Sequence, residues 1–225
     1  MDSVLVDEQI RDLDFSVGEG ETLNLNLAAF SAFPNASLRV KVAQGGHFHG
    51  AFADFSQGKG TFKIQIDLLG EGADASWHLA SISSKQSEKT IDASLTHFAP
   101  HTQGLMSNYG IVEDASRLIF TGVSLIQNGA SASVTRQEAK IILFDPECLG
   151  RASPILKIDE DDVQASHAAV VGKLNEQHLY YLLSRGMSLD SARRLLTLGY
   201  LKPIEGFFAD ETLKQKIDQA IEEGI

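Results

Sequence analysis

Two hydrophobic periods divide this chain. From Leu23 to His167, apolar residues alternate with polar ones or form short β-branched runs, which is typical of short strands separated by Gly, Asn, Asp and Ser turns. Beyond His167 the apolar residues recur at helical spacing. The predicted strands are Leu23–Leu27, Leu38–Val42, Phe62–Leu68, Trp77–Ile82, Ile91–Leu95, Leu118–Phe120, Val123–Ile126 and Lys140–Phe144. Residues 1–15 carry few strand signals, and Asp7–Asp12 is interpreted as an exposed entry segment.

The turns between these strands repeat one form. Each combines a small or turn-forming residue, then Ala, then Ser or Asp, and then a strand. They are Pro34–Ser37, Glu71–Asp74, Glu113–Ser116 and Asn128–Ser131. Successive rungs of a coiled sheet stack their corners, and small side chains allow that stacking. The pattern therefore favours an irregular parallel β-helix. An antiparallel sandwich is the alternative, because periodicity alone does not separate the two folds.

The C-terminal part of the chain contains helix signals. A first helix is predicted from about Glu176, with Asn175 as its N-cap and Gly186 at a left-handed C-cap position. A second helix follows, capped by Ser188 and ended by Gly199. Both helices are short, so together they predict a compact helical tail rather than a second large domain.

A third helix is predicted from about Asp210. Its apolar residues follow an i, i+4, i+7, i+8 stripe, which consists of Leu213, Ile217, Ala220 and Ile221. Such a stripe is buried on its own domain or on a partner, and the pattern does not say which. We therefore predict a mainly β fold, with a β core over residues 1–171 and a small C-terminal helical region over residues 172–225.

Composition narrows the class of protein. With 43% hydrophobic and 22% charged residues, the chain is typical of soluble globular proteins. The longest apolar runs have about four residues, against the roughly 20 that a membrane span needs, and the N-terminus lacks the features of a secretory signal. Cys148 is the single cysteine, so we expect a reducing cytoplasm. The net charge of −11 argues against nucleic-acid or anionic-membrane partners, despite the small basic patch Arg193-Arg194.

His167 is the first candidate for chemistry, because it lies where the β pattern gives way to the helical one. Imidazole can ligate iron, and it can change its charge near neutral pH when a partner approaches. The alternative is a histidine whose ring is satisfied by hydrogen bonds at a sheet-to-helix junction. We therefore treat His167 as a candidate functional residue and a candidate metal ligand.

Two further pairs of histidines stand close together in the sequence. His47 and His49 would face the same side of a strand, and paired imidazoles can hold zinc or iron. However, no third ligand is near in sequence and the flanking glycines favour a loop, so metal binding is the minor interpretation. His97 and His101 would meet on a helix, but Pro100 favours an extended path, and we interpret both as structural.

The remaining candidates have simpler explanations. Cys148 can in principle accept sulfur as a thiolate, but Asp145 and Glu147 disfavour that charge, so an exposed loop thiol without a role is favoured. The acidic run Asp159–Asp162 lacks the glycine and the spaced ligands of a calcium loop, which favours a solvated turn. The sequence has no defensible Ser/His/Asp arrangement and no Gly-rich loop ending in Gly-Lys-Ser or Gly-Lys-Thr. We therefore expect neither an autonomous enzyme nor an ATP-binding protein.

Several ordered stretches carry a family signature. In the C-terminal half they are residues 161–174 (DDVQASHAAVVGKL), 179–186 (LYYLLSRG) and 192–201 (ARRLLTLGYL). Upstream they are Ala99–His101, Arg117–Val123, Asn128–Ala130 and Ile142–Asp145. Together these stretches resemble the SufB/SufD family, which supplies scaffold proteins of the SUF iron–sulfur cluster assembly system. The resemblance covers about residues 61–201, with weaker agreement back to Leu23.

The resemblance implies a right-handed parallel β-helix followed by a small helical domain. In this family the SufB and SufD β-helices pair, and each helical tail docks a SufC-type ATPase that carries the nucleotide chemistry. The implied partners are a SufB-like subunit or a second copy of this chain, together with a SufC-type ATPase. A transient iron–sulfur cluster is implied, with no tightly bound cofactor. The docking region would include Leu179, Tyr180, Leu183, Arg185 and Gly186.

Two departures separate this chain from SufB-type members. Ala139 stands where SufB-type members carry a cysteine, and Ala168 stands where they carry a glutamate after the signature histidine. His167 itself is kept, so the resemblance implies a SufD-like scaffold with this residue at the cluster-assembly interface. The N-terminal helical domain of longer members is also missing, which predicts a short natural form or a fragment.

Two other functions stay open at this point. One is a carbohydrate-binding or polysaccharide-active β-helix protein, although a single Trp and four Tyr are few for such a surface. The other is a structural homodimer without chemistry.

Overall fold

A computed structural model describes residues 1–174 and 176–223. Its strands are β1 Asp2–Val6, β2 Leu13–Val17, β3 Thr22–Ala29, β4 Ala36–Val42, β5 His47–Asp54, β6 Lys59–Leu68, β7 Asp74–Ser83, β8 Glu88–His97, β9 Gln103–Val112, β10 Arg117–Ile126, β11 Ser133–Leu143, β12 Leu149–Ile158 and β13 Val163–Lys173. Its helices are α1 Glu176–Ser184, α2 Leu189–Leu201 and α3 Glu211–Glu223, with 3₁₀ segments η1 Asp7–Gln9 and η2 Lys202–Phe207.

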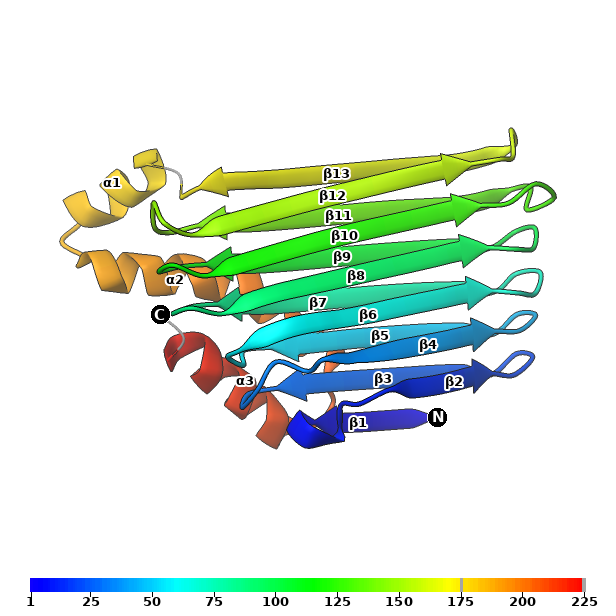
Figure 1. Cartoon of the computed structure of the whole chain (residues 1–225), viewed down its shortest axis with the longest axis horizontal. Coiled ribbons are helices and arrows are strands. Elements are labelled where there is room, and N and C mark those ends of the chain that lie inside the picture. Colours follow the sequence, from blue (N-terminus) through cyan, green and yellow to red (C-terminus); the bar gives the residue numbers. More distant parts are fainter. Residues whose placement is uncertain (175, 224–225) are drawn as a thin grey trace.

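The strands alternate between two sheets, as Figure 1 shows. Sheet A has the order β1-β3-β5-β7-β9-β11-β13 and sheet B the order β12-β10-β8-β6-β4-β2. Neighbouring strands within each sheet pair in parallel. Each turn of the chain therefore adds one strand to each sheet, which is a parallel β-helix of about six turns. The predicted fold is confirmed, and the antiparallel sandwich is excluded.

Turns stack on one another along the β-helix. At one corner, the amide of Gly45 donates to the carbonyl of Glu71 (2.9 Å), that of Gly72 to Pro100 (3.2 Å) and that of His101 to Ser131 (2.9 Å). The predicted corners Glu71–Asp74 and Asn128–Ser131 lie in this column, whereas Pro34–Ser37 and Glu113–Ser116 join strands at the opposite edge. The repeated turn form therefore belongs to two columns of corners.

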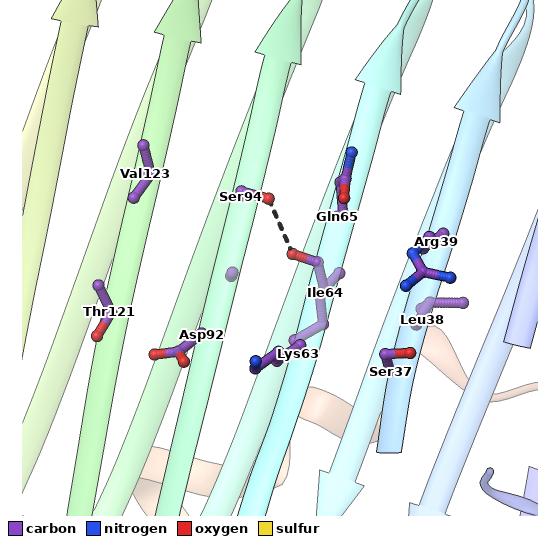
Figure 2. Close-up of a pocket in the computed structure, with 11 residues that line it drawn as sticks. Ser37, Leu38, Arg39, Lys63, Ile64, Gln65, Asp92, Ser94, Thr121 and Val123 are labelled. Carbon is purple, nitrogen blue, oxygen red and sulfur yellow. Dashed lines mark hydrogen bonds between the residues drawn. The ribbon is translucent and has the colours of Figure 1, made fainter. Parts of the chain in front are cut away.

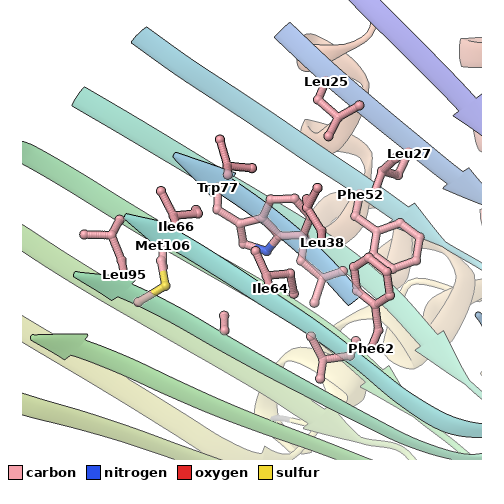
Figure 3. Packing of buried hydrophobic residues seen from close by; sticks show 14 of the residues in the cluster. Leu25, Leu27, Leu38, Phe52, Phe62, Ile64, Ile66, Trp77, Leu95 and Met106 are labelled. Atoms are coloured by element: carbon pink, nitrogen blue, oxygen red, sulfur yellow. The ribbon is translucent and has the colours of Figure 1, made fainter. Parts of the chain in front are cut away.

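The space between the sheets is filled by inward-facing apolar side chains (Figure 3). Trp77, Phe48 and Phe52 are fully buried, and the rings of Phe52 and Phe62 lie 4.9 Å apart across the interior. Each such side chain contributes about 1.5–3 kcal/mol of burial free energy. Alternation along the strands supplies these residues, because every second side chain points inward.

Two sequence interpretations are wrong in the N-terminal half. Residues 1–15 include β1 and β2, which pair with β3 and β4. Both are edge strands with few buried positions, so their alternation is weak. The His47–His49 segment is a strand rather than a loop. Gly50 belongs to this strand. Its position requires glycine, because a Cβ atom there would lie 2.7 Å from the rings of Phe48 and Trp77.

The helical region follows its predicted signals closely. After α1, Gly186 has φ +89°, and the amides of Gly186 and Met187 donate to the carbonyls of Leu183 (3.0 Å) and Leu182 (3.3 Å), which is a Schellman C-cap. Ser188 caps α2 by accepting from the amide of Ser191 (3.1 Å). The predicted end of α2 at Gly199 is wrong, since the helix continues to Leu201. The predicted N-cap Asn175 lies outside the described residues.

The helices α2 and α3, with η2, cover the outer face of sheet A (Figure 1). The predicted α3 stripe is buried there, with Ile217 and Ile221 fully enclosed against outward residues of sheet A such as Ala53 and Ile82. This stripe therefore packs on its own chain. Within the described residues, no helix combines the length and the apolar character that crossing a bilayer requires.

Candidate functional site

The C-terminal end of the β-helix is uncovered. Strands β12 and β13 each pair on one side only, with β10 and β11. Several apolar side chains of this last turn are exposed, including Val170 (56%), Val171 and Ile155. An edge strand with free backbone groups and apolar side chains is a template for pairing with another chain. This end is therefore a candidate interaction surface of the β-helix.

His167 lies in the middle of β13 and is exposed. It is in register with Gln137 of β11, whose side chain faces the interior, so the imidazole stands on the inner side of the last turn. The interpretation of His167 as a hinge residue is wrong, because β13 continues to Lys173 and α1 begins at Glu176. An exposed edge strand lacks clear alternation, so the sequence predicts no strand beyond His167. The proposed domain boundary between residues 171 and 172 stays a prediction.

Beneath His167 the interior is polar. Gln137 is only 4% exposed, and its Nε2 donates to Ser124 Oγ on β10 (2.7 Å) and to the carbonyl of Ile155 on β12 (3.0 Å). Gln137 thus connects the two sheets at the open end. Gly122 leaves room for it, because a Cβ atom there would lie 2.6 Å from Gln137 Oε1. Sequence reasoning missed Gln137 because it precedes the predicted strand Lys140–Phe144, and only the structure shows that it lies at an inward position of β11.

The residue that matches the SufB cysteine position in the resemblance lies beside this histidine. Ala139 of β11 is in register with Ala169 of β13, two positions from His167, and it faces the interior. The β-helix therefore brings the two signature positions onto neighbouring strands at its open end. With alanine at this position, the chain presents an imidazole there but no thiol.

A second exposed surface lies on α1. Tyr180 (75% exposed), Tyr181 and Leu183 are open to solvent, while Leu179 is half-buried. The guanidinium of Arg185 lies 5.2 Å from the ring centre of Tyr181. Of the five residues predicted for docking, Tyr180 and Leu183 are thus accessible on α1, and Arg185 is accessible directly after it. Gly186, also exposed, forms its C-cap.

Arg193 joins the helical region to the β-helix. Its Nη2 donates to the carbonyl of Phe144 (3.0 Å) and to Asp145 Oδ1 (2.9 Å). Glu113 lies in the same electrostatic environment: burial raises its pKa to about 7, with Asp114 and Asp145 adding to the shift and Arg193 opposing it. The corner beneath α2 is therefore sensitive to pH near neutrality.

The other sequence candidates lie apart from this end. His97 is buried on β8, with Nδ1 2.8 Å from Thr102 Oγ1, and burial lowers its pKa to about 4. His101 is exposed in the following turn, so the two histidines do not form one site. His47 and His49 do face one side of β5. Among the described residues, no group of three or more His, Cys, Asp or Glu side chains is arranged to hold a metal ion.

Cys148 and the acidic run have local structural roles. Cys148 is half-buried rather than exposed, packs against the core, and its Sγ donates to the carbonyl of Asp145 (3.0 Å). In the acidic run, Glu160 Oε2 accepts from the amide of Gly129 (2.9 Å), and backbone hydrogen bonds lower the pKa of Glu160. The run therefore stabilises a stacked turn.

The outer face of sheet B carries a cavity of about 200 Å³ with a mixed polar and apolar lining (Figure 2). It crosses β4, β6, β8 and β10, with Arg39, Lys63 and Asp92 among its charged residues. Of the described residues that line it, none is aromatic. Sugar-binding surfaces on β-helices usually combine aromatic rings with acidic clusters, so nothing in this cavity favours the carbohydrate alternative.

Comparison with known proteins adds the family. The family model described as "SUF system FeS cluster assembly, SufBD core domain" matches residues 21–200. The iron-sulfur cluster assembly protein SufD of Bacillus subtilis is 32% identical over 159 residues, which are 71% of this chain and 36% of that protein. A SufBD family protein of Staphylococcus epidermidis is 28% identical over 136 residues, which are 60% of this chain and 29% of that protein.

The chain spans about a third of the length of these curated relatives. The matched region nevertheless includes most of the β-helix, the open end with His167, and α1 with nearly all of α2. The fold, the signature stretches and the relatives all point to one family. The chain belongs to the SufB/SufD family defined by the SufBD core domain, as a SufD-like member.

Proposed function

We propose that this chain is a scaffold subunit of an iron–sulfur cluster assembly complex. Its open end pairs with a SufB-like subunit or with a second copy of the chain, and His167 stands at the interface where a transient cluster is assembled. Its α1–α2 surface docks a SufC-type ATPase. The chain itself carries out no catalysis, binds no cofactor tightly and works in the cytoplasm.

One observation carries the proposal: an imidazole on the inner side of an edge strand that has one free edge and exposed apolar side chains. Pairing through β12 and β13 would satisfy their free backbone groups and cover the exposed apolar side chains of the last turn. The same pairing would enclose His167 between two β-helices, where a second chain can supply the thiolate that Ala139 does not. Imidazole is a suitable ligand for iron in such a mixed site.

Replacing His167 with Ala tests the site. We expect unfolding in urea to be unchanged, because the side chain is exposed. Cluster-dependent enzyme activity, measured in cells that rely on this chain, should fall strongly. His101→Ala is the matched control. His101 is also exposed, but it lies in the turn between β8 and β9, away from the open end. Equal activity of the His167→Ala variant and the control would refute the interface role.

Docking is tested by changing the exposed surface of α1. Removing the whole helical region would uncover sheet A, because α3 is buried against it, so a truncation would confound binding with folding. The double variant Tyr180→Asp, Leu183→Asp changes only exposed positions and should abolish ATPase capture in a pull-down. Leu69→Asp is the control, as Leu69 is exposed to a similar degree far from α1. Capture by the double variant at the control level would exclude α1 as the docking surface.

A further inference from the structure

His47 and His49 form a second feature that the scaffold function does not use. They are separated by one residue on β5, and both side chains point outward from sheet A. Residues two apart on a strand are about 6.6 Å apart along the chain, a span over which two imidazole rings can converge on one ion. His47 is partly exposed and His49 is exposed, so solvent ions have direct access to both.

Each ring is oriented by a partner on the neighbouring strand β7. His47 Nδ1 lies 2.9 and 3.0 Å from the two carboxylate oxygens of Asp74, and His49 Nδ1 lies 3.0 Å from Ser76 Oγ. A carboxylate only accepts hydrogen bonds, so Nδ1 of His47 is the donor in this contact, and Nε2 of the neutral ring is the nitrogen left to bind a metal ion. No described residue makes a hydrogen bond to Nε2 of either ring. Metal-binding histidines typically show this arrangement, with the other ring nitrogen donating to a carboxylate or another acceptor.

A cavity of about 290 Å³ adjoins His49 and provides space for an ion with its water ligands. Asn24 and Asn26 line it. Their Nδ2 atoms donate to Asp2 Oδ1 (2.7 Å) and to the carbonyl of Phe207 (2.9 Å), which leaves their amide oxygens to accept hydrogen bonds from bound water. Ser76 lines the cavity as well, and Gly50, Ala51 and Phe207 form its apolar side, while His47 lies beside the cavity rather than in its lining. The cavity beside His49 and the paired rings, each with Nδ1 in a hydrogen bond to β7, are two separate observations on one patch.

We propose that His47 and His49 bind one divalent first-row transition-metal ion through their Nε2 atoms, with Asp74 and Ser76 orienting the rings. Imidazole nitrogen suits Zn²⁺, Cu²⁺, Ni²⁺ and Fe²⁺. Because the protein supplies only two ligands, water fills the remaining positions and the ion exchanges readily. The site is separate from the open end: β5 and β13 are divided by β7, β9 and β11 in sheet A.

Calorimetric titration of the full chain with Zn²⁺ tests the site. We expect one ion per chain, and we expect His47→Ala and His49→Ala each to weaken binding by at least tenfold, because one imidazole replaces a chelating pair. Asp74→Ala keeps both ligands but removes the orienting carboxylate, and should weaken binding about 10- to 100-fold. With Cu²⁺, electron paramagnetic resonance should show two coupled nitrogens, reduced to one in either single variant.

One exposed histidine serves as the control. His101→Ala should bind Zn²⁺ as the unchanged chain does, and His167→Ala is measured beside it to detect Zn²⁺ bound at the open end instead. Absence of saturable Zn²⁺ binding, equal binding after removal of both His47 and His49, or loss of binding only in His167→Ala would overturn the proposal. Circular dichroism confirms folding of each variant, since both rings lie on the solvent side of β5.

Discussion

Lys89 and Asp54 form an ion pair inside the β-helix, where neither side chain is accessible to solvent. The Lys89 Nζ lies 2.7 Å from Asp54 Oδ2 and donates to the carbonyl of Ile82 (2.7 Å), while Ser81 Oγ donates to the same carboxylate (2.6 Å). Burial lowers the pKa of Lys89, and the charge of Asp54 opposes that shift. The buried ion pair is thus tolerated in the interior because hydrogen bonds from neighbouring polar groups satisfy both of its members.

Replacing Lys89 with Met should lower the free energy of unfolding by about 3–5 kcal/mol, because the charge of Asp54 stays buried without its partner. The double variant Lys89→Met, Asp54→Asn should recover a large part of that loss, since no buried charge remains. Urea unfolding of the single and double variants measures both effects. A Lys89→Met protein as stable as the original would contradict this account of the pair.

Glu113 supplies a pH-dependent contribution to stability. Its folded pKa, raised to about 7, lies above its unfolded value, so the folded state holds the proton more tightly and stability falls as pH rises from about 4.5 to 7. Glu113→Gln removes this loss. Relative to the original chain, the variant should gain about 1–2 kcal/mol between pH 5 and pH 8, a range reduced for solvent screening of Asp114 and Asp145. Urea unfolding at both pH values measures the difference; parallel pH profiles would contradict the prediction.

At the scale of elements, clear alternation of apolar and polar residues predicted the central strands, whereas weak alternation left the outermost strands unpredicted. β6, β8 and β10 have neighbours on both sides and bury every second side chain, so their pattern is visible in the sequence. β1 and β13 are edge strands whose faces are largely exposed, and exposed positions place no constraint on polarity. Strand signals therefore fade where this β-helix ends, which includes the end through which we propose that it pairs with a partner.

Of two glycines predicted to end helices, Gly186 forms the C-cap of α1, whereas Gly199 lies inside α2. Gly186 has φ +89° and no atom near its Cβ position, so Gly186→Ala changes backbone strain alone and should destabilise α1 by about 1 kcal/mol. Gly199 lies inside α2 with equal space, and Gly199→Ala should instead stabilise that helix by about 0.5–1 kcal/mol. Amide hydrogen exchange in α1 and α2 measures the two opposite shifts. Effects of the same sign would contradict the assigned caps.

The whole molecule brings together residues that the sequence analysis could only consider one at a time. His167, Gln137 and Ala139 are neighbours because β11 and β13 pair in a fixed register. The family resemblance identified His167 and Ala139, but Gln137 required the register, since nothing in the sequence says that β11 is the neighbour of β13. The pairing of His47 with Asp74 was hidden for the same reason.

Pairing at the open end is predicted to depend on its apolar edge. Val170→Lys places a charge on an exposed position of β13, a substitution that natural edge strands use to prevent pairing. We expect the variant to remain folded and to lose association with a SufB-like subunit or with a second copy, as measured by analytical ultracentrifugation. Val4→Lys on the opposite edge strand β1 is the control. Equal loss of association in both variants would contradict pairing through the β13 edge.

Because each strand pairs only with the strands one turn before and after it, strand pairing contributes to stability approximately as a sum of nearest-neighbour terms. Fraying therefore starts at the terminal rungs, and amide exchange should slow progressively from β13 towards β7. A partner stacked on the last rung would act as an end cap. Its binding should therefore slow amide exchange in β13 and, to a decreasing extent, in the strands of several turns below it.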